Sequence, residues 1–381
     1  MSVIERIKSL DALRGIAAVW VLLAHHFNAI HGFYSVADSW VRFTPLRLLT
    51  EARFPVILFF VLSGFVLAGQ LMGERTLTYR GYVIRRVCRI YMPFAASIIL
   101  SWALYNLIGD KNVIGAAPTI NSDWTGSGSI GALGRHLAML GRRMDTNLNG
   151  VVWSLVVELR ISLLFPILVW VAIRSKAALF IFAAISFASY LSLVRYGQAG
   201  PIYTGNTIGL SFVATTYFLF PFAIGISVKQ VWPRVPAAST KMAVFWGIVL
   251  LLCFLAVQRL GSPILKDFGY ILLAGGLMLL ILKSQLFNSG LDSPLIQWFG
   301  RVSYSLYLFH VIVLVALMKA LSTQLSLIWL VSASLIISFV VAEIANRLIE
   351  QPSTKLGRLL SQRTDRPALP QHPAVFDTGR H

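Results

Sequence analysis

The first hydrophobic segment of the chain contains two ionisable side chains and reads SLDALRGIAAVWVLLAHHFNAI. Arg14 and His25 are eleven residues apart, about three helical turns, so both project from one face, roughly 16 Å apart along the axis. Asp11, one turn before Arg14, can orient the guanidinium. Ionisable groups within a membrane are costly, so this stripe predicts a polar path through the protein. The structural alternative is an arginine that snorkels to the membrane edge and a hydrogen-bonded core histidine.

Two further arginines, Arg86 and Arg89, lie just ahead of the third hydrophobic segment in the basic stretch GERTLTYRGYVIRRVCRIY. If helical, they are one turn apart and can grip a polyanion together, because the guanidinium fork matches phosphate oxygens. The alternative is an ordinary basic cluster that contacts anionic lipid headgroups at the cytoplasmic surface.

The fourth segment carries a carboxylate and a guanidinium, Glu158 and Arg160, a few residues after Trp153. On an ideal helix they face different ways, and at membrane depth each needs a partner or water. Trp153 suits the external interface of a membrane. We interpret Glu158 as functional, whereas for Arg160 a structural ion pair with Glu343 is the alternative.

The ninth segment, WFGRVSYSLYLFHVIV, places Tyr307 and His310 on one helix face. His310 is expected near the middle of the membrane, at a depth comparable with that of His25. A lone histidine at such a place is more often packed and hydrogen-bonded than catalytic, so both interpretations stay open. In the second segment, Ser63 and Gly64 predict close helix packing or a bend.

The composition defines the class of protein. Hydrophobic residues make up 57% of the 381 positions, charged residues only 13%, and the mean hydropathy is +0.73. These values predict an all-α, polytopic membrane helix bundle with about ten transmembrane helices. Two cysteines are too few for a disulfide framework or a metal site, and the net charge of +18 is scattered among loops, so neither a metal nor nucleic acid is expected to bind. The expected spans are 12–30, 54–72, 92–108, 151–173, 177–194, 209–228, 243–258, 268–282, 302–320 and 326–346.

Ten spans put both termini on the same side of the membrane. That side receives 21 of the 33 Lys and Arg residues, against 11 on the other, so the positive-inside rule predicts cytoplasmic termini. One membrane domain then fills 1–351, and 352–381 forms a polar cytoplasmic tail that we expect to be disordered. The external loops include 31–53, which is charged, and 109–150, whose Trp124 is expected to be available for sugar stacking.

In this order, the segments resemble the membrane acyltransferase-3 family of bacterial acyl-CoA-dependent O-acyltransferases. The likeness covers about residues 8–352 and rests on LDALRGIAAVWVLLAHH, FFVLSGFVL, the Arg-x-x-Arg of Arg86 and Arg89, WSLVVE, FGRVSYSLYLFH and IEQP. It implies an enzyme that moves an acyl group, most often acetyl, from cytoplasmic acyl-CoA to a hydroxyl of a glycan or another acceptor. It also implies that Arg14 and His25 are the key pair and that Arg86 and Arg89 handle the donor. Some relatives carry an extracytoplasmic hydrolase-like domain, and here any such step is expected either to need a separate partner or not to occur.

Residues and resemblance together give one hypothesis of mechanism, in which acyl-CoA, acetyl-CoA foremost, is the co-substrate. Arg86 and Arg89 hold its phosphates and Arg14 faces phosphate or pantetheine, while His25 acts as general base on the acceptor hydroxyl, because a neutral imidazole is poised near physiological pH. A covalent acyl-histidine is the alternative. Glu158 either assists His25 or binds the acceptor. The acceptor site is expected to include Trp153, Ser154, Tyr307 and His310.

The rival function is a membrane transporter or flippase for a sugar-containing or lipid-linked substrate, which would also place charges and histidines at mid-membrane. A non-catalytic scaffold is the third candidate. The expected location is the bacterial inner membrane, with acyl-CoA, a glycan or lipid-linked sugar and membrane lipids as partners. The acceptor and the self-association of the chain stay open.

Overall fold

The structure, a computed structural model, describes residues 7–30, 50–72, 78–126, 128–197 and 203–364. Within these residues the elements are helices, and ten helical stretches are long and apolar enough to cross a membrane, which confirms the predicted bundle. The long helices are α1 (Lys8–Phe27), α3 (Arg53–Leu71), α4 (Tyr79–Ile108), α7 (Trp153–Arg174), α8 (Ala178–Arg195), α9 (Ile208–Tyr217) continued by α10 (Leu219–Val231), α11 (Thr240–Gln258), α12 (Pro263–Lys283), α14 (Pro294–Leu321) and α15 (Leu327–Ala345). The shorter ones are α5 (Pro118–Ser122), α6 (Ile130–Leu137), η2 (Arg143–Asp145), η3 (Trp232–Arg234), α13 (Gln285–Leu291), η4 (Asn346–Glu350) and α16 (Gln351–Thr364).

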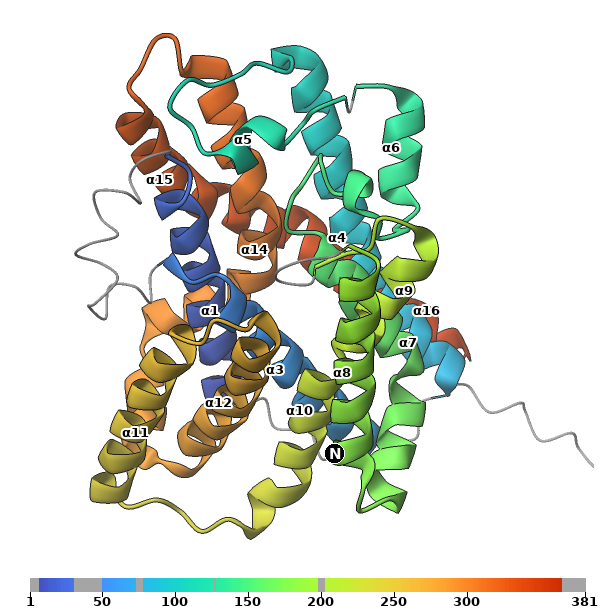
Figure 1. Cartoon of the computed structure of the whole chain (residues 1–381), viewed down its shortest axis with the longest axis vertical. Helices are drawn as coiled ribbons and strands as arrows, with labels where there is room; N and C mark the ends of the chain where they lie inside the picture. The colour runs from blue at the N-terminus through green and yellow to red at the C-terminus, as the bar shows by residue number, and fades with distance from the viewer. Residues whose placement is uncertain (1–6, 31–49, 73–77, 127, 198–202, 365–381) are drawn as a thin grey trace, which may run out of the picture.

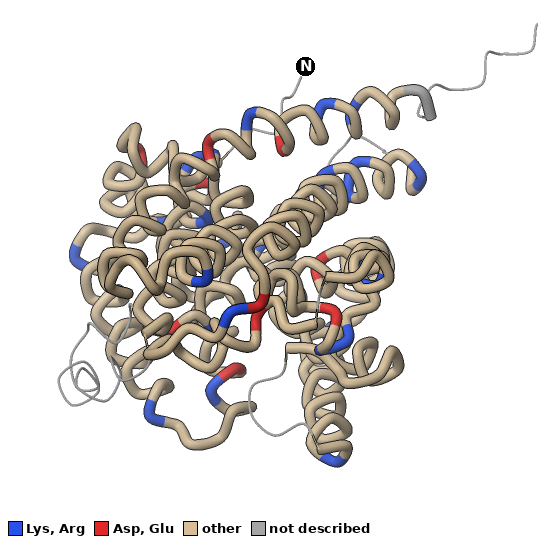
Figure 2. The backbone as a smooth tube through the Cα atoms, turned by 90° about the horizontal axis from the view of Figure 1, so that it is seen from above, with Lys and Arg blue, Asp and Glu red and all other residues tan. Residues whose placement is uncertain are grey.

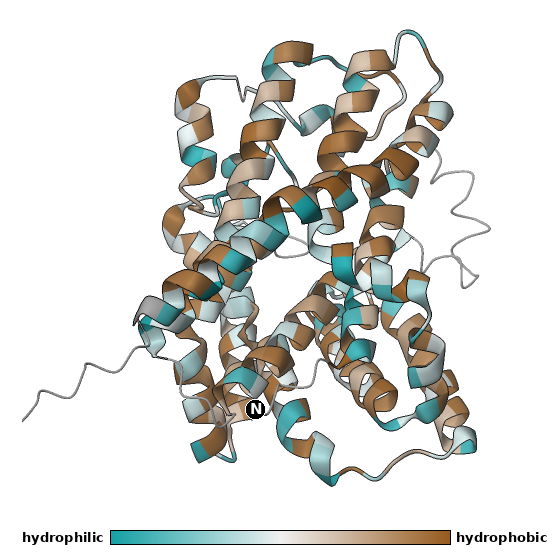
Figure 3. Cartoon of the chain, turned by 180° about the vertical axis from the view of Figure 1, so that it is seen from behind, coloured by the Kyte–Doolittle hydropathy of each residue, from teal (hydrophilic) through white to brown (hydrophobic). Residues whose placement is uncertain are grey.

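The long helices are largely apolar, as the brown in Figure 3 shows, and many of their large apolar side chains are exposed. Large side chains such as Phe180 and Trp329 are 77% and 71% exposed. Contiguous apolar surface of this extent is costly in water and suits contact with lipid chains, so the exposed face agrees with a membrane-spanning bundle.

Two glycine crossings set the positions of the central helices. A Cβ on Gly15 of α1 would lie 2.4 Å from the backbone nitrogen of Gly300 on α14, and a Cβ on Gly64 of α3 would lie 2.3 Å from the carbonyl oxygen of Phe222 on α10. Helices in such contact pack backbone against backbone, as small residues allow in membranes. The expectation of close packing at Gly64 is therefore confirmed, and the Gly15 crossing holds the face beside Arg14 against α14.

The third span is longer than predicted at its N-terminal end. Helix α4 begins at Tyr79 instead of near residue 92, and the Thr78 hydroxyl caps it by accepting a hydrogen bond from the Gly81 N–H at 3.1 Å. Such a cap satisfies a backbone donor that the first turn leaves free. As a result, Arg86 and Arg89 lie inside a continuous helix and not in a surface loop.

The expected disorder of the tail from 352 is wrong as far as residue 364. Helix α16 packs along α4: the Arg85 Nε donates to the Ser361 Oγ at 2.6 Å, and a Cβ on Gly357 would lie 3.0 Å from the Cys88 Cβ. Figure 2 shows several Lys and Arg positions on α16, which leads into the grey trace. The remainder of the tail, and residues 31–49 of the first external loop, lie outside the described residues.

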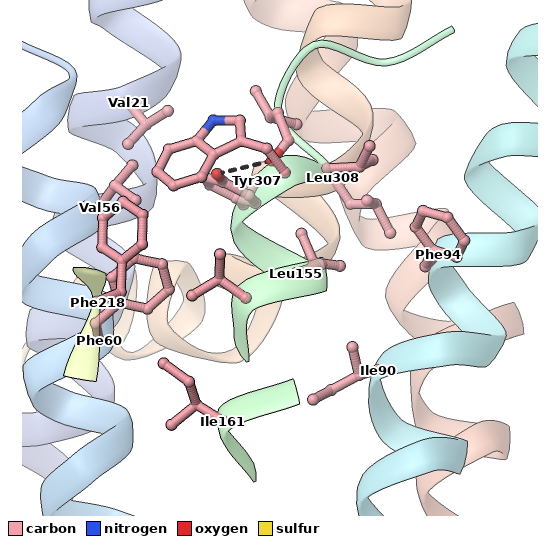
Figure 4. Close-up of a cluster of buried hydrophobic side chains, with 14 of the residues drawn as sticks. Val21, Val56, Phe60, Ile90, Phe94, Leu155, Ile161, Phe218, Tyr307 and Leu308 are labelled. Atoms are coloured by element: carbon pink, nitrogen blue, oxygen red, sulfur yellow. Dashed lines mark hydrogen bonds between the residues drawn. The ribbon is translucent and has the colours of Figure 1, made fainter. Parts of the chain in front are cut away.

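The segment between α4 and α7 forms a cap at one end of the molecule, at the top of Figure 1. Trp124 in this cap is fully buried, and its indole N–H donates to the Ser101 Oγ at 2.9 Å. The expectation that Trp124 is available for sugar stacking is therefore wrong, because its ring completes the core instead. The same core continues between the helices, where Figure 4 shows Phe60, Phe218 and Tyr307.

Candidate active site

Arg14 lines a narrow cavity of about 30 Å³ between α1, α3, α7 and α14. The cavity has room for about two waters. The other polar groups that line it are Ser63, Ser154, Glu158, Ser303, Tyr304 and Tyr307. Four separate segments that the sequence singled out therefore meet at one place.

His25 lies against a second histidine from α14. The ring centroids of His25 and His310 are 5.2 Å apart, and those of Tyr307 and His310 are 6.2 Å apart. His26 is 3% exposed, and its Nδ1 lies 2.8 Å from the carbonyl oxygen of Leu22. The two adjacent histidines thus face different surroundings, as the 100° rotation between neighbouring helical positions predicts.

The hydrogen bonds of His310 indicate its tautomer. Its Nδ1 lies 3.0 Å from the carbonyl oxygen of Leu306, and a carbonyl oxygen only accepts hydrogen bonds. We therefore assign the proton of the neutral ring to Nδ1, which leaves a lone pair on Nε2. That Nε2 is buried and has no hydrogen-bond partner among the described residues. A buried basic nitrogen without a partner costs free energy, so His310 is a better candidate for chemistry than its sequence context suggested.

Glu158 is bound to groups on the side of the cavity away from the histidines. Its Oε1 accepts a hydrogen bond from the Arg86 Nη2 at 2.9 Å and one from the Ser63 Oγ at 3.3 Å. Arg86 also donates to the Ser162 Oγ at 2.8 Å and is 8% exposed. Within the described residues, Glu158 makes no hydrogen bond to His25, so it orients Arg86 and not the imidazole.

Positive charge exceeds negative charge around Glu158. The charges that act on Arg89 are Arg14 and Arg86 of like sign, and Glu158 and Glu350 of opposite sign. Neither Arg14 nor Arg89 makes a hydrogen bond or ion pair with another described residue. Uncompensated guanidinium groups inside a membrane protein are costly, and they point to an anionic ligand.

Glu350 belongs to this charged region but was not identified as a site residue from the sequence. Its Oε2 accepts hydrogen bonds from the Ser305 Oγ at 2.7 Å and the Asn346 Nδ2 at 2.9 Å. It lies at the end of the π-helical turn η4, a form often found at functional sites. The one sequence signal was its place in the IEQP piece of the family resemblance.

Two of the predicted acceptor residues are joined directly. The Ser154 Oγ and the Tyr307 hydroxyl are 2.7 Å apart, and each lies 3.1 Å from the carbonyl oxygen of Val151, so one hydroxyl donates to the other while the second donates to that carbonyl. Trp153, by contrast, is only 8% exposed and packs against Phe60 and other rings. The indole is thus part of the wall behind the cavity and not an anchor at an exposed interface.

The proposed ion pair between Arg160 and Glu343 does not form. Arg160 donates to the Ser211 Oγ at 2.7 Å and to the carbonyl oxygen of Leu140 at 2.8 Å. Glu343 instead accepts from Arg347 at 2.5 Å and from the Trp298 indole at 2.9 Å. Arg160 therefore ties the cap to α9, because carbonyl and hydroxyl oxygens satisfy its fork.

A second buried arginine, Arg53, was missed because it lies at the boundary of a predicted loop. Its Nε and Nη2 donate to the two carboxylate oxygens of Asp267 at 3.1 and 2.5 Å, and the Tyr217 hydroxyl donates to the same carboxylate at 2.6 Å. The guanidinium also lies over the rings of Tyr203 and Phe218, 4.8 and 5.2 Å from their centroids. The Arg53 guanidinium and the Asp267 carboxylate are thus satisfied by hydrogen bonds and ring contacts within the protein, which indicates a structural role for Arg53.

A further charged group lies where the end of α14 meets the cap. The ammonium of Lys319, 1% exposed, donates to the Asp110 carboxylate at 3.0 Å. Burial raises the pKa of Asp123 in the same cap to about 7, against the opposing effect of Lys319. Asp123 therefore titrates near neutral pH.

A ten-span helical bundle with charged and titratable side chains gathered between its helices defines a membrane protein built for a reaction or a transport step. The chain belongs to the acyltransferase domain family, which matches residues 7–346.

Three curated relatives are similar to the chain. It is 22% identical to the putative peptidoglycan O-acetyltransferase of Bacillus subtilis (strain 168), over 92% of this chain and 55% of the relative. It is 23% identical to nodulation protein 10 of Rhizobium leguminosarum bv. viciae, over 93% and 95%. It is 22% identical to a peptidoglycan O-acetyltransferase of Listeria monocytogenes, over 92% and 56%. The chain thus spans about half the length of two of these relatives, and no solved structure matches it.

Proposed function

We propose that the protein is an integral-membrane O-acyltransferase of the bacterial inner membrane, which moves an acetyl group from cytoplasmic acetyl-CoA to a hydroxyl of a glycan. The observation that carries the proposal is the excess of guanidinium groups over carboxylates around Arg89, together with the contact between His25, on the same helix as Arg14, and His310. The names of the relatives support acetyl as the group and a glycan as the acceptor.

The proposed donor, acetyl-CoA, is a polyanion, and the excess of positive charge around Arg89 favours the binding of a polyanion. The phosphates of acetyl-CoA would be bound by Arg89 and Arg14, with Arg86 held in place by Glu158. Guanidinium forks suit phosphate oxygens better than ammonium groups do. The sequence predicted that Arg86 and Arg89 bind the phosphates together. In this proposal Arg86 does not bind them directly, because it already donates a hydrogen bond to Glu158.

His25 serves as the general base in this proposal. It removes the proton of the acceptor hydroxyl as the ester C–O bond forms and the thioester C–S bond breaks, and the proton then reaches the departing thiolate. The ring centroids of His310 and His25 are 5.2 Å apart, and the Nε2 of His310 has no hydrogen-bond partner among the described residues. His310 therefore either holds His25 in orientation or shares its proton. A neutral imidazole can do both without a metal or a covalent intermediate.

The test is turnover of acetyl-CoA by the purified full chain in lipid nanodiscs, followed as release of free CoA thiol. We expect release that rises on addition of a saccharide acceptor and saturates with acetyl-CoA. The absence of both thiol release and CoA binding would favour the rival transporter, which has no reason to turn over a thioester.

The orientation is tested by cysteine labelling. In a chain with Cys88 and Cys253 replaced by Ser, Lys111→Cys in the cap and Lys355→Cys on α16 occupy opposite sides of the bundle by the order of spans. A membrane-impermeant maleimide added to intact spheroplasts should label position 111 and not 355. The reverse pattern would overturn transfer from the cytoplasm outward.

A further inference from the structure

A second and larger cavity lies at the side of the bundle opposite to the N-terminus. Its volume is about 370 Å³, within the range of small-molecule sites, roughly 300–1,000 Å³. It is lined by residues from the links before α3, α9 and α12, by the first turns of α3 and α12, and by Asn28, which caps the end of α1. By the order of spans, all of these face the side away from α16.

We propose that this cavity binds a neutral, multiply hydroxylated sugar unit of the acceptor glycan, an assignment that rests on the proposed acyl transfer and adds the place and chemistry of acceptor binding. Charge is the first argument. Among the described residues that line the cavity there are two cations, Arg53 and Lys266, and two carboxylates, Glu51 and Asp267. A balanced site attracts neither a phosphate nor a free cation, and it suits a neutral polar ligand.

Unused hydrogen-bonding groups are the second argument. The ammonium of Lys266 is partly exposed and makes no hydrogen bond or ion pair with the described residues. The Asn28 Oδ1 is buried and accepts no hydrogen bond there either, although its Nδ2 donates to the carbonyl oxygen of Thr50 at 3.3 Å. The Lys266 ammonium is a strong donor at the cavity and fits the oxygen atoms of sugar hydroxyls, whereas the buried Asn28 Oδ1 can accept from a sugar only when its side chain turns toward the cavity.

An aromatic ring supplies the third argument. Tyr203 is 42% exposed. The Arg53 guanidinium lies 4.8 Å from the centroid of the Tyr203 ring, and the ring of Trp153 lies 4.9 Å from the same centroid. The ring is thus held firmly but keeps exposed surface. The apolar C–H face of a pyranose can cover such a ring and bury apolar area without losing its hydroxyl contacts.

The position of the cavity relative to the histidines is the fourth argument. Asn28 follows His25 by three residues on α1, about 4.5 Å along the helix axis. Trp153 separates this cavity from the one beside Arg14, since its ring contacts both Tyr203 and Phe60, which lines the latter. A sugar in the cavity would therefore lie one helical turn from the proposed base, on the side away from the donor arginines.

The test uses chitotetraose, a neutral oligosaccharide of N-acetylhexosamines, with the purified full chain in nanodiscs and isothermal titration calorimetry. We expect saturable binding to the unmodified chain, and about tenfold weaker binding for Lys266→Met and for Asn28→Ala, because each removes one hydrogen-bonding group. Tyr203→Phe should bind nearly as well as Tyr, whereas Tyr203→Ala should bind more weakly. The matched control is Lys111→Met, an exposed lysine on the same side that does not line the cavity.

Binding of free CoA, measured in the same preparations, separates this proposal from the proposed function. Unchanged CoA affinity with weakened chitotetraose binding supports the cavity as the acceptor site. Equal chitotetraose affinity in all variants, or no saturable binding to the unmodified chain, overturns it even if acetyl-CoA is turned over. If the unmodified chain does not turn over acetyl-CoA but the variants weaken chitotetraose binding as expected, the proposed acyl transfer is refuted. The cavity then remains a sugar-binding site.

Discussion

The cavity beside Arg14 and the cavity beside Arg53 each contain a guanidinium group, half-buried at Arg14 and buried at Arg53, yet these groups are satisfied to very different degrees. Arg53 makes two hydrogen bonds to Asp267 and lies over aromatic rings, whereas Arg14 has no hydrogen bond or ion pair with another described residue. Removing a charge from water is costly in both places, and more so for the buried Arg53 than for the half-buried Arg14. The difference shows that the unsatisfied charge, not burial itself, is the sign of a ligand site.

The balance of charge separates the two regions further. Around Arg89, three arginines face two carboxylates, but the loop-side cavity holds two of each sign. The first region therefore suits a polyanion and the second a neutral polar molecule. The following predictions are ordered from the largest expected effect to the smallest.

The largest effect is expected at His25. His25→Ala should lower acetyl transfer about 10²–10⁴-fold, the usual contribution of a general base. His26→Ala is the matched control, because it removes the adjacent imidazole on a different face. Transfer is measured as acetyl ester formed on the saccharide, with gel filtration to verify folding. An inactive His26→Ala beside an active His25→Ala would mean that the Arg14 face is not the reaction path.

Asp267→Ala should reduce stability more than activity per folded molecule. It leaves Arg53 buried without a counter-ion, a change that typically costs about 3–5 kcal/mol. The control is Asp292→Ala, whose ion pair with Lys8 is exposed and contributes about 0–1 kcal/mol. Thermal unfolding in detergent measures both. Equal melting temperatures for the two variants would contradict the structural role of Arg53.

Arg89→Ala should weaken CoA binding about tenfold, because it removes one charge-assisted contact to phosphate. Arg89→Lys should recover only part of this loss, since an ammonium lacks the fork. Arg85→Ala is the control, since its guanidinium bonds to Ser361 on α16. Because these arginines lie within the bundle, added salt should matter less than for a surface cluster. Unchanged affinity in Arg89→Ala would remove it from the donor site.

The smallest effect is the pH dependence contributed by Asp123. Burial raises its pKa to about 7, so the folded chain keeps a proton that the unfolded chain has already lost above about pH 4. The stability from this group is therefore full at low pH, declines as pH rises toward 7, and is constant above it. Between pH 6 and 8 the loss amounts to about 1 kcal/mol. Asp123→Asn should flatten the melting temperature over this window, and an unchanged slope would show that Asp123 is ionised throughout.

Much of the candidate site could be predicted because helical periodicity is local. The Arg14 and His25 stripe, the opposite orientation of His26, and the shared face of Tyr307 and His310 all follow from 3.6 residues per turn. The partners could not be predicted in the same way. Arg160 was assigned to Glu343, but it bonds to Ser211 and Leu140, because ion-pair partners depend on which helices meet.

By itself, the sequence determined the class of the protein, its ten spans and the residues that carry charge into them, since hydrophobicity and spacing act along the chain. Only the tertiary structure decided which charges are neutralised. It pairs Arg86 with Glu158 and Arg53 with Asp267, leaves Arg14 and Arg89 uncompensated, and buries Trp124 in the cap. These outcomes depend on helix crossings such as that of Gly15 with Gly300, where contacts between residues hundreds of positions apart fix the distances on which electrostatic energies depend.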